Sequence, residues 1–520
     1  MTGATKHGAF GSDPANFVRM LPRQTVQPSK EALALLALDM QSSSDDVGPG
    51  PDSEENMFVP AGYTYFGQFV DHDLTRDTTS TFDGSNAPTN QRTPRFDLDC
   101  VYGRGPVDDP NMYEADGATL SLGKVVDADS GRKDLLRDSS DKAIIGDPRN
   151  DENSIVSQIQ ASMIRLHNNK VAALKAAGKT GADLFNAARN ETRWEYQLVL
   201  VEDYLKRIVD GQQVAQFDQL RKPGARGKSQ DDGAYLLYPP ENRAALPIEF
   251  AGAAYRFGHS MVRNGYFLQD KESFPIFDGA GTANSLVGFE ALLPTHVIKD
   301  WRRFFPDATR EGADPFSPAP GQTAGNNGKN DSADDAPGKP RLQFAYRIDP
   351  SVVDPLSALP AVVVDDPPPS LMVRNLWRGA AFMLPTGQDF ARKLNIAPLD
   401  KKYLVARQEL KQPSAAGEKQ FQYVPIDANL QAATPLWFYI LAEAQKSMVD
   451  RFAGTVFNET DMKDAAAATG AQLGAVGGRI VLEVFHGLLD SDPDSYRNHP
   501  DAANWRSAFA SSRAWFVVTS

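Results

Sequence analysis

The segment GQFVDHDLTRD, residues 67–77, concentrates side chains that can move protons or bind a ligand. If this segment is helical, Gln68 and His72 lie four residues apart on one face, with Asp71 at its edge. Asp73 turns about 100° away from His72, because an α-helix has 3.6 residues per turn. One face would therefore offer a base, an amide and a carboxylate to a ligand, while Asp73 would serve a group behind it. The alternative is an ordinary acidic helix end with one incidental histidine.

The segment TPRFDLDCVYG, residues 93–103, carries candidate ligands for a cation at alternate positions. In an extended loop Thr93, Arg95, Asp97 and Asp99 point the same way. Their hydroxyl, backbone carbonyl and carboxylate oxygens are the ligands that a hard cation such as Ca²⁺ prefers. The alternative is a solvated edge strand with two surface aspartates.

Two further segments hold isolated candidates for catalysis. GDPRNDEN, residues 146–153, contains Arg149 and Glu152 just before a helical pattern, where they could also serve as an acidic N-terminal cap. The apolar segment IEFAGAAYRFGHSMVRNGY, residues 248–266, contains His259. A lone histidine on such a surface is either a ligand or a hydrogen-bonded core residue.

The elements that must position these side chains are mainly helical. Apolar residues recur every three or four positions, which predicts helices at the end of 58–77 and at 155–177, 184–209, 247–263, 370–383, 433–448 and 473–489. The stretch 78–150 is rich in Asp, Gly, Pro and Asn and is typical of long functional loops. Alternating strand patterns are few and short.

The predicted architecture is a mainly α fold with one large domain, long loops and few short strands. Residues 1–55 read as an arm packed on the main body, and residues 56–520 form that body. A polar insertion at about 306–340 cannot bury enough apolar surface to order itself.

Composition narrows the class of protein. The net charge is −13 and no block of Lys and Arg is present, which argues against a nucleic-acid partner. Cys100 is the only cysteine, so an intrachain disulfide and a cysteine-built metal site are excluded. No signal peptide and no apolar run of about 20 residues is found. The expectation is a cytoplasmic protein with no membrane span, although leaderless secretion would leave no mark.

Taken in order, these motifs resemble those of the animal haem peroxidase (peroxidase–cyclooxygenase) superfamily. The shared motifs are GQ-x-x-DHD, the 93–103 loop, GD-x-R-x-x-E, YRFGH at 255–259, and RNLWRG at 374–379. The resemblance runs from about Phe58 to about Tyr496. It implies a haem b cofactor and a bound Ca²⁺.

On the distal side of the haem, the resemblance implies three catalytic residues. His72 is the acid–base, Arg149 stabilises negative charge on the peroxide, and Gln68 lines the pocket. The carboxyls of Asp71 and Glu152 are expected to form esters with the haem.

On the proximal side, the resemblance makes His259 the iron ligand. Asn375 is expected to accept a hydrogen bond from His259 Nδ1–H, and Arg256 to contact the haem. The resemblance implies a calcium shell of Asp73, Thr93, the Arg95 carbonyl, Asp97 and Asp99.

The expected function is a haem peroxidase that uses hydrogen peroxide to oxidise a halide, thiocyanate or small aromatic donor, with a role in the response to oxidative stress. In one branch of the family a Met follows the ester Glu and forms a sulfonium link. Asn153 stands there in this chain, which favours iodide, thiocyanate, bromide or phenolic donors over chloride.

Two alternatives stay open. The first is a haem-dependent fatty-acid dioxygenase of the same superfamily, which has a radical Tyr three residues before the proximal His. Here Arg256 holds that position and Tyr255 lies four residues before His259. The second is a haem-binding scaffold or adhesion protein without turnover.

Overall fold

The structure is a computed structural model. It describes residues 15–43, 52–77, 82, 88–222, 234–243, 245–269, 272–278, 284–306, 342–364, 366–466 and 471–509. The insertion predicted at about 306–340 lies almost wholly outside the described residues. Within the described part of the chain, no helix combines the length and apolarity needed to cross a lipid bilayer.

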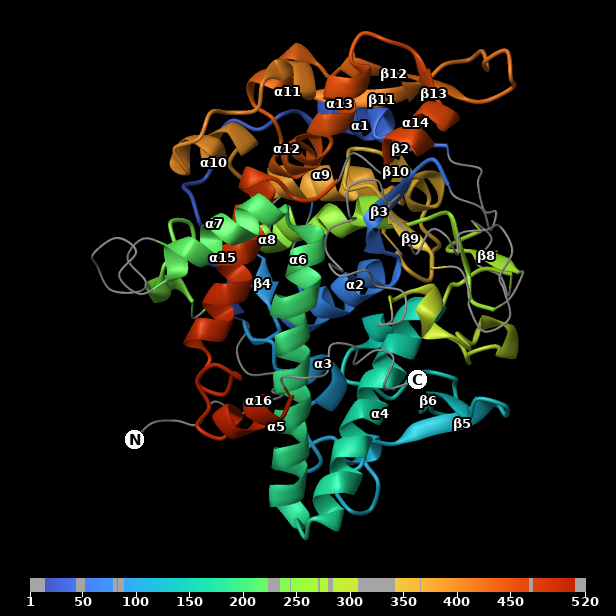
Figure 1. Cartoon of the computed structure of the whole chain (residues 1–520), viewed down its shortest axis with the longest axis vertical. Helices are drawn as coiled ribbons and strands as arrows, with labels where there is room; N and C mark the ends of the chain where they lie inside the picture. The colour runs from blue at the N-terminus through green and yellow to red at the C-terminus, as the bar shows by residue number, and fades with distance from the viewer. Residues whose placement is uncertain are drawn as a thin grey trace.

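Helices dominate the fold, as the sequence predicts (Figure 1). The helices are α1 (Lys30–Asp39), α2 (Gly62–Leu74), α3 (Asp99–Tyr102), α4 (Ser154–Ala176), α5 (Gly181–Val199), α6 (Leu205–Ile208), α7 (Gly211–Arg221), α8 (Ile248–Gly252), α9 (Leu371–Ala381), α10 (Gly387–Lys393), α11 (Ala428–Ala432), α12 (Leu436–Ala444), α13 (Lys446–Phe452), α14 (Glu459–Ala466), α15 (Ala475–Ser491) and α16 (Ala502–Phe509).

The described strands are short and pair into small separate sheets. The strands are β1 (Ala15–Asn16), β2 (Gln41–Ser42), β3 (Glu55–Pro60), β4 (Thr89–Asn90), β5 (Leu122–Asp127), β6 (Arg132–Leu135), β7 (Gly265–Phe267), β8 (Ser273–Pro275), β9 (Phe344–Tyr346), β10 (Val352–Val353), β11 (Val405–Glu409), β12 (Gln420–Pro425) and β13 (Phe457–Asn458). The pairs are β1–β4, β10–β2, β3–β9, β5–β6 and β7–β8, and β11–β12–β13 form a three-stranded sheet. All pair antiparallel except β10 with β2.

Helix α2 lies at the centre of the molecule, with the long antiparallel helices α4 and α5 beside and below it (Figure 1). Most of α2 is buried. Its first residue, Gly62, has no room for a side chain, because a Cβ would lie 2.4 Å from the Phe305 ring. This close approach fixes the start of the helix that carries His72.

The helix predicted at 184–209 is α5 continued by a π-helical turn, Leu200–Tyr204, and by α6. The single helix predicted at 247–263 is wrong in one respect. The chain breaks after α8 at Ala253 and continues as a 3-10 helix, Ala254–Met261, which carries His259. The tighter path stacks the rings of Phe250 and Tyr255, with centroids 4.8 Å apart.

The loop stretch predicted at 78–150 contains more regular structure than expected, because α3 and the β5–β6 hairpin lie within it. The apolar patch of the N-terminal arm forms α1, which packs against α9.

Candidate functional site

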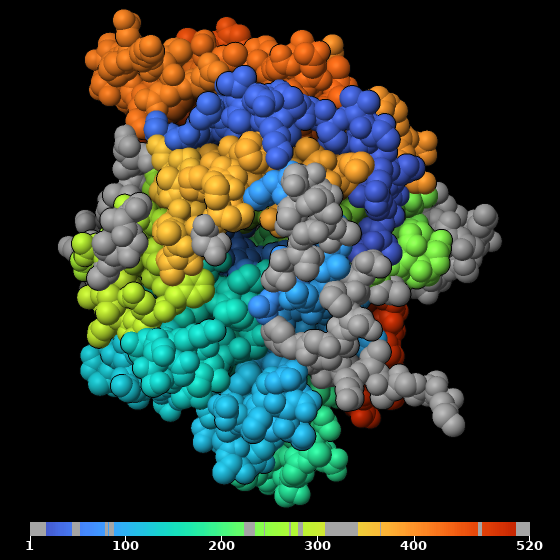
Figure 2. Space-filling model, turned by 180° about the vertical axis from the view of Figure 1, so that it is seen from behind, coloured from blue at the N-terminus to red at the C-terminus, as the bar shows by residue number. Residues whose placement is uncertain are grey.

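One cavity of about 320 Å³ brings together most of the side chains singled out in the sequence. It lies where α2, the 148–152 turn, the 254–261 segment and α9 meet. Its walls include Gln68, Asp71, His72, Arg149, Glu152, Arg256 and His259. Figure 2 shows the surface hollowed between the yellow-orange part of the chain that includes α9 and the blue and teal parts below it.

His72 is held as a neutral base. Its Nδ1 lies 2.7 Å from Asn150 Oδ1, and the Asn150 amide donates to Gln160 Oε1 at 2.9 Å. Asn150 therefore presents its oxygen to the ring, so Nδ1 carries the proton and Nε2 keeps its lone pair. Burial and then the charge of Arg149 lower the pKa of His72 to about 3. The ring is thus uncharged at neutral pH.

Arg149 is fixed by an acidic partner and by the end of α2. Asp147 accepts from its Nε at 3.1 Å and from its Nη2 at 2.8 Å, a bidentate pairing. The same Nη2 donates to the backbone carbonyl of Thr75, where α2 leaves its last carbonyls unpaired within the helix. Asp147 is shared with the buried Arg92. A guanidinium held in this way cannot swing away from the cavity without losing several charged hydrogen bonds.

The cavity carboxyls, Asp71 and Glu152, take up protons easily. Burial is the main cause that raises the pKa of Glu152 to about 7, and burial also raises the pKa of Asp71. Thr75 Oγ1 donates to Asp71 at 3.0 Å, and Gln68 Nε2 lies 3.5 Å from Glu152. Asn153 caps α4 and donates to Gln68 Oε1 at 3.1 Å, so it sets which end of the Gln68 amide faces Glu152.

His259 enters the same cavity from the 254–261 segment. Its Nδ1 lies 2.7 Å from the Asn375 amide on α9, as the predicted pairing requires. The direction of this hydrogen bond is opposite to the one expected from the sequence. Asn375 presents its Nδ2 to His259, because Arg256 Nη1 donates to Asn375 Oδ1 at 3.2 Å. Burial and then Arg256 lower the pKa of His259 to about 3. His259 Nε2 has no hydrogen-bond partner among the described residues.

Cations gather at one side of this cavity. Arg256, Arg374 and Arg378 all line it. Burial and then Arg256 lower the pKa of Arg378 to about 10, while Arg374 pairs with Asp366 at 2.9 Å. The cavity can therefore accept a ligand that has an apolar body and anionic groups.

A second group of predicted residues meets behind α2. One carboxylate oxygen from each of Asp73, Asp97 and Asp99 lies within 4.8 Å of the other two. Burial and then the neighbouring Asp97 and Asp99 raise the pKa of Asp73 well above its usual range. The pKa of Asp99 rises to about 7, mainly through burial. Three buried carboxyls this close together need either protons or a cation between them.

The other two predicted ligands are placed less directly. Thr93 Oγ1 donates to Asp97 Oδ2 at 2.8 Å and so belongs to the cluster. The Arg95 guanidinium is directed to Asp492, 3.4 Å away, which leaves only its carbonyl for the loop. Three contacts were not expected from the sequence: Tyr196 and Cys100 touch Asp73, and Arg92 pairs with Asp99.

Sequence reasoning also missed Asn150 and Asp147, the residues that orient His72 and Arg149. Both lie inside the GDPRNDEN segment, adjacent to the residues that were identified. Their polar side chains next to Arg149 are the only signal that could have marked them.

Residues 76–288 match the family model described as animal haem peroxidase. The chain is 32% identical over 119 residues to the chorion peroxidase of Drosophila melanogaster, a match that covers 22% of this chain and 14% of that protein. Only a small part of that relative is therefore represented.

Two solved structures have a similar fold. Peroxidase A from Dictyostelium discoideum matches over 99% of this chain and 93% of that chain, with a TM-score of 0.52 at 14% identity. A fatty acid alpha-dioxygenase from Arabidopsis thaliana matches over 95% of this chain and 74% of that chain, with a TM-score of 0.50 at 15% identity. These likenesses confirm the mainly α fold predicted from the sequence.

Proposed function

We propose that this chain is a haem peroxidase acting on hydrogen peroxide, because residues 76–288 match the family model described as animal haem peroxidase and the fold is similar to that of a solved peroxidase. The donor is a halide, thiocyanate or small aromatic molecule. One observation supports this most: a neutral His72 with a bare Nε2, a fixed Arg149 and a second neutral histidine, His259, line the same cavity.

The residues fit a haem. His259 Nε2 supplies the nitrogen ligand that haem iron takes in this family, and the apolar walls suit a porphyrin. Arg256 and Arg378, which line the same cavity, are suited to the negatively charged propionates of a haem. When bound, the haem supplies the redox chemistry toward peroxide and the donor.

The chain's own contribution is proton transfer and charge stabilisation. His72 Nε2 accepts a proton from the incoming peroxide and returns it to the oxygen that leaves as water. Asn150 holds the ring in the tautomer that this requires. Arg149, fixed by Asp147, stabilises negative charge as the O–O bond breaks.

If His259 held the iron through Nε2, its ring proton would sit on Nδ1 and would need an acceptor. We expect the Asn375 amide to turn and present Oδ1 in the haem-bound protein, as the sequence predicts. Arg256 would then lose its present partner and become available to an anionic group of the cofactor.

Asp71 and Glu152 are proposed to attach the haem covalently as esters. Both carboxyls line the cavity, and burial raises the pKa of each. After peroxide treatment, acid–acetone extraction should leave haem on the wild-type protein and remove more from Asp71→Val or Glu152→Gln. Complete extraction from fully turned-over wild type would exclude the covalent link.

The Asp73, Asp97 and Asp99 cluster is proposed to bind Ca²⁺ together with Thr93 and the Arg95 carbonyl. Without the cation, like charges about 4 Å apart repel by about 4 kcal/mol at an effective dielectric near 20. Asp97→Ala or exhaustive chelation is therefore expected to lower the melting temperature and slow the reaction with peroxide, since Asp73 directly follows His72.

Asp108→Ala is the matched control, because Asp108 is an exposed acid only a few residues after the loop. It should change neither quantity. Elemental analysis that finds no calcium in active, stable protein would exclude the calcium site.

The function is tested against the dioxygenase alternative on the haem-loaded protein. Peroxide-dependent oxidation of iodide or guaiacol is expected, and oxygen uptake with a long-chain fatty acid is not. The Tyr255 hydroxyl lies in the same cavity but donates a hydrogen bond to the Tyr204 hydroxyl, 3.0 Å away. Oxygen uptake with a fatty acid, without peroxidase turnover, would indicate the dioxygenase. The absence of both activities would indicate a non-catalytic haem protein.

A further inference from the structure

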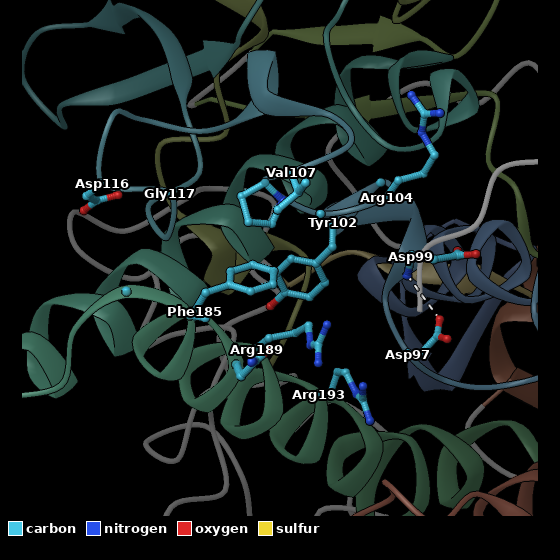
Figure 3. A pocket seen from close by; sticks show the side chains of 16 residues that line it. Asp97, Asp99, Tyr102, Arg104, Val107, Asp116, Gly117, Phe185, Arg189 and Arg193 are labelled. Atoms are coloured by element: carbon cyan, nitrogen blue, oxygen red, sulfur yellow. Dashed lines mark hydrogen bonds between the residues drawn. The ribbon is translucent and has the colours of Figure 1, made fainter. Parts of the chain in front are cut away.

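A second pocket, of about 470 Å³, lies outside the haem cavity on the outer side of α5 (Figure 3). It is bounded by the first half of α5, by α3 with the turn that follows it, and by the 116–117 loop. Its volume is in the range of small-molecule sites. Asp97 and Asp99 of the proposed calcium cluster also line this pocket, whereas its other residues have no part in the proposed function.

Two cations from one helix face line this pocket. Arg189 and Arg193 are four residues apart on α5, so both side chains project to the same side, as Figure 3 shows. Arg193 is 1% exposed, and its Nη2 donates to the Asp494 carbonyl at 3.2 Å. Neither Nε has a hydrogen-bond partner within the described part of the chain. Two adjacent, largely buried guanidinium groups repel each other unless an anion lies near them.

Arg189 is the cation that lacks an acceptor. It has no hydrogen-bond or ion-pair partner among the residues that the structure describes. Its guanidinium makes a cation–π contact with Phe185, with Cζ 5.3 Å from the ring centroid. Burial and then Arg193 lower the pKa of Arg189, which is the direction expected for a cation without a nearby anion of its own. Asp97 and Asp494 offset only part of this effect.

The other charged groups of the pocket are held by the protein itself. Arg104 pairs with Asp109 at 2.6 Å. Asp116 accepts from the backbone N–H groups of Ala118 and Thr119. The acids of the calcium cluster face Thr93 and Arg92. Arg189 is therefore the group best placed to bind a ligand's negative charge.

The remaining walls are apolar and aromatic. Tyr102 and Phe185 meet edge to face, with ring centroids 6.0 Å apart and an interplanar angle of 86°. Val107 lies across from them in Figure 3, and Pro106 also lines the pocket. A bare inorganic anion would leave these walls without contacts, whereas a ligand with an aromatic body would cover them.

We propose that this pocket binds a small aromatic carboxylate, with its carboxylate on Arg189 and Arg193 and its ring against Tyr102 and Phe185. A guanidinium binds a carboxylate through two parallel hydrogen bonds. The ligand would join α3 to α5 next to the loop that carries Asp97 and Asp99. The site is separate from the cavity that contains His72 and His259.

The test uses the haem-loaded protein with phenylacetate and its neutral match, phenylacetamide, in titration calorimetry. Phenylacetate is expected to bind and phenylacetamide to bind about ten-fold more weakly or less, since a charge-assisted hydrogen bond contributes about that factor. Arg189→Gln should weaken phenylacetate binding by about ten-fold. Arg189→Lys keeps the charge and should recover part of the affinity.

Arg104→Gln is the matched control, because it removes a cation from the same pocket that is already paired with Asp109. It should leave the affinity unchanged. Equal binding of phenylacetamide, or equal affinity in wild type and in a folded Arg189→Gln variant, would overturn the proposal. Equal loss in Arg104→Gln would overturn the assignment to Arg189. Acetate binding as tightly as phenylacetate would overturn the role of the aromatic walls.

Discussion

Replacing His259 by alanine is expected to abolish the Soret band of a histidine-ligated haem, or to leave only loosely held haem that a desalting column removes. His259 Nε2 is a cavity nitrogen without a protein partner among the described residues, so nothing else is expected to take its place. The measurement is the optical spectrum of the purified variant together with its haem content by pyridine extraction.

The half-exposed His499 supplies the control, because it lies outside the cavity and packs against Trp194. His499→Ala should keep both the spectrum and the haem. A His259→Ala protein with the unchanged spectrum of a histidine-ligated haem would show that the iron ligand lies elsewhere.

The second large effect is expected at the distal base. His72→Ala should keep the haem and its proximal ligand but slow the reaction with hydrogen peroxide by about 10²–10⁴-fold, the contribution of a positioned acid–base group. Stopped-flow spectra of the haem after mixing with peroxide measure this rate. An unchanged rate would remove His72 from the mechanism.

The pH dependence provides a second readout of the same residue. The base is the neutral ring, and the pKa of His72 is lowered to about 3. The wild-type rate should therefore stay flat as the pH falls through 6.5, the ordinary value, and decline only as the pH approaches 3. Asn150→Leu removes the hydrogen bond that fixes the tautomer, so a slower rate at every pH is expected. A wild-type rate that halves near pH 6.5 would contradict the buried, neutral state.

Much of the helical framework could be predicted from apolar spacing. The helix predicted at 155–177 is α4, Ser154–Ala176, although 154–164 are buried on every side and only its later turns have a buried face and an exposed one. The same reasoning failed at 247–263, where the pattern continues through Ala253 but the backbone does not. Periodicity records which side is buried and cannot distinguish an α-helix from a 3-10 turn that buries the same side.

The candidate site shows a similar division. The spacing of Gln68 and His72 places both on the cavity side of α2, as predicted. The direction of each histidine hydrogen bond could not be predicted from the sequence. It depends on a further residue that hydrogen-bonds to the asparagine and so orients its amide group. Gln160 decides which end of Asn150 faces His72, and Arg256 decides which end of Asn375 faces His259. His72 is 78 residues from Asn150 and Arg256 is 119 residues from Asn375, so these contacts form only in the fold.

The lone cysteine can serve as a probe of local unfolding around α3. Cys100 is fully buried on α3, with Sγ 3.6 Å from Asp73 Oδ1. A thiol reagent can reach it only when α3 moves away from α2. When reclosing is faster than labelling, the labelling rate divided by that of an exposed thiol gives the equilibrium population of this open state. With no second cysteine to confuse the signal, the stability of this one region can be followed at equilibrium in the intact protein, without unfolding the rest.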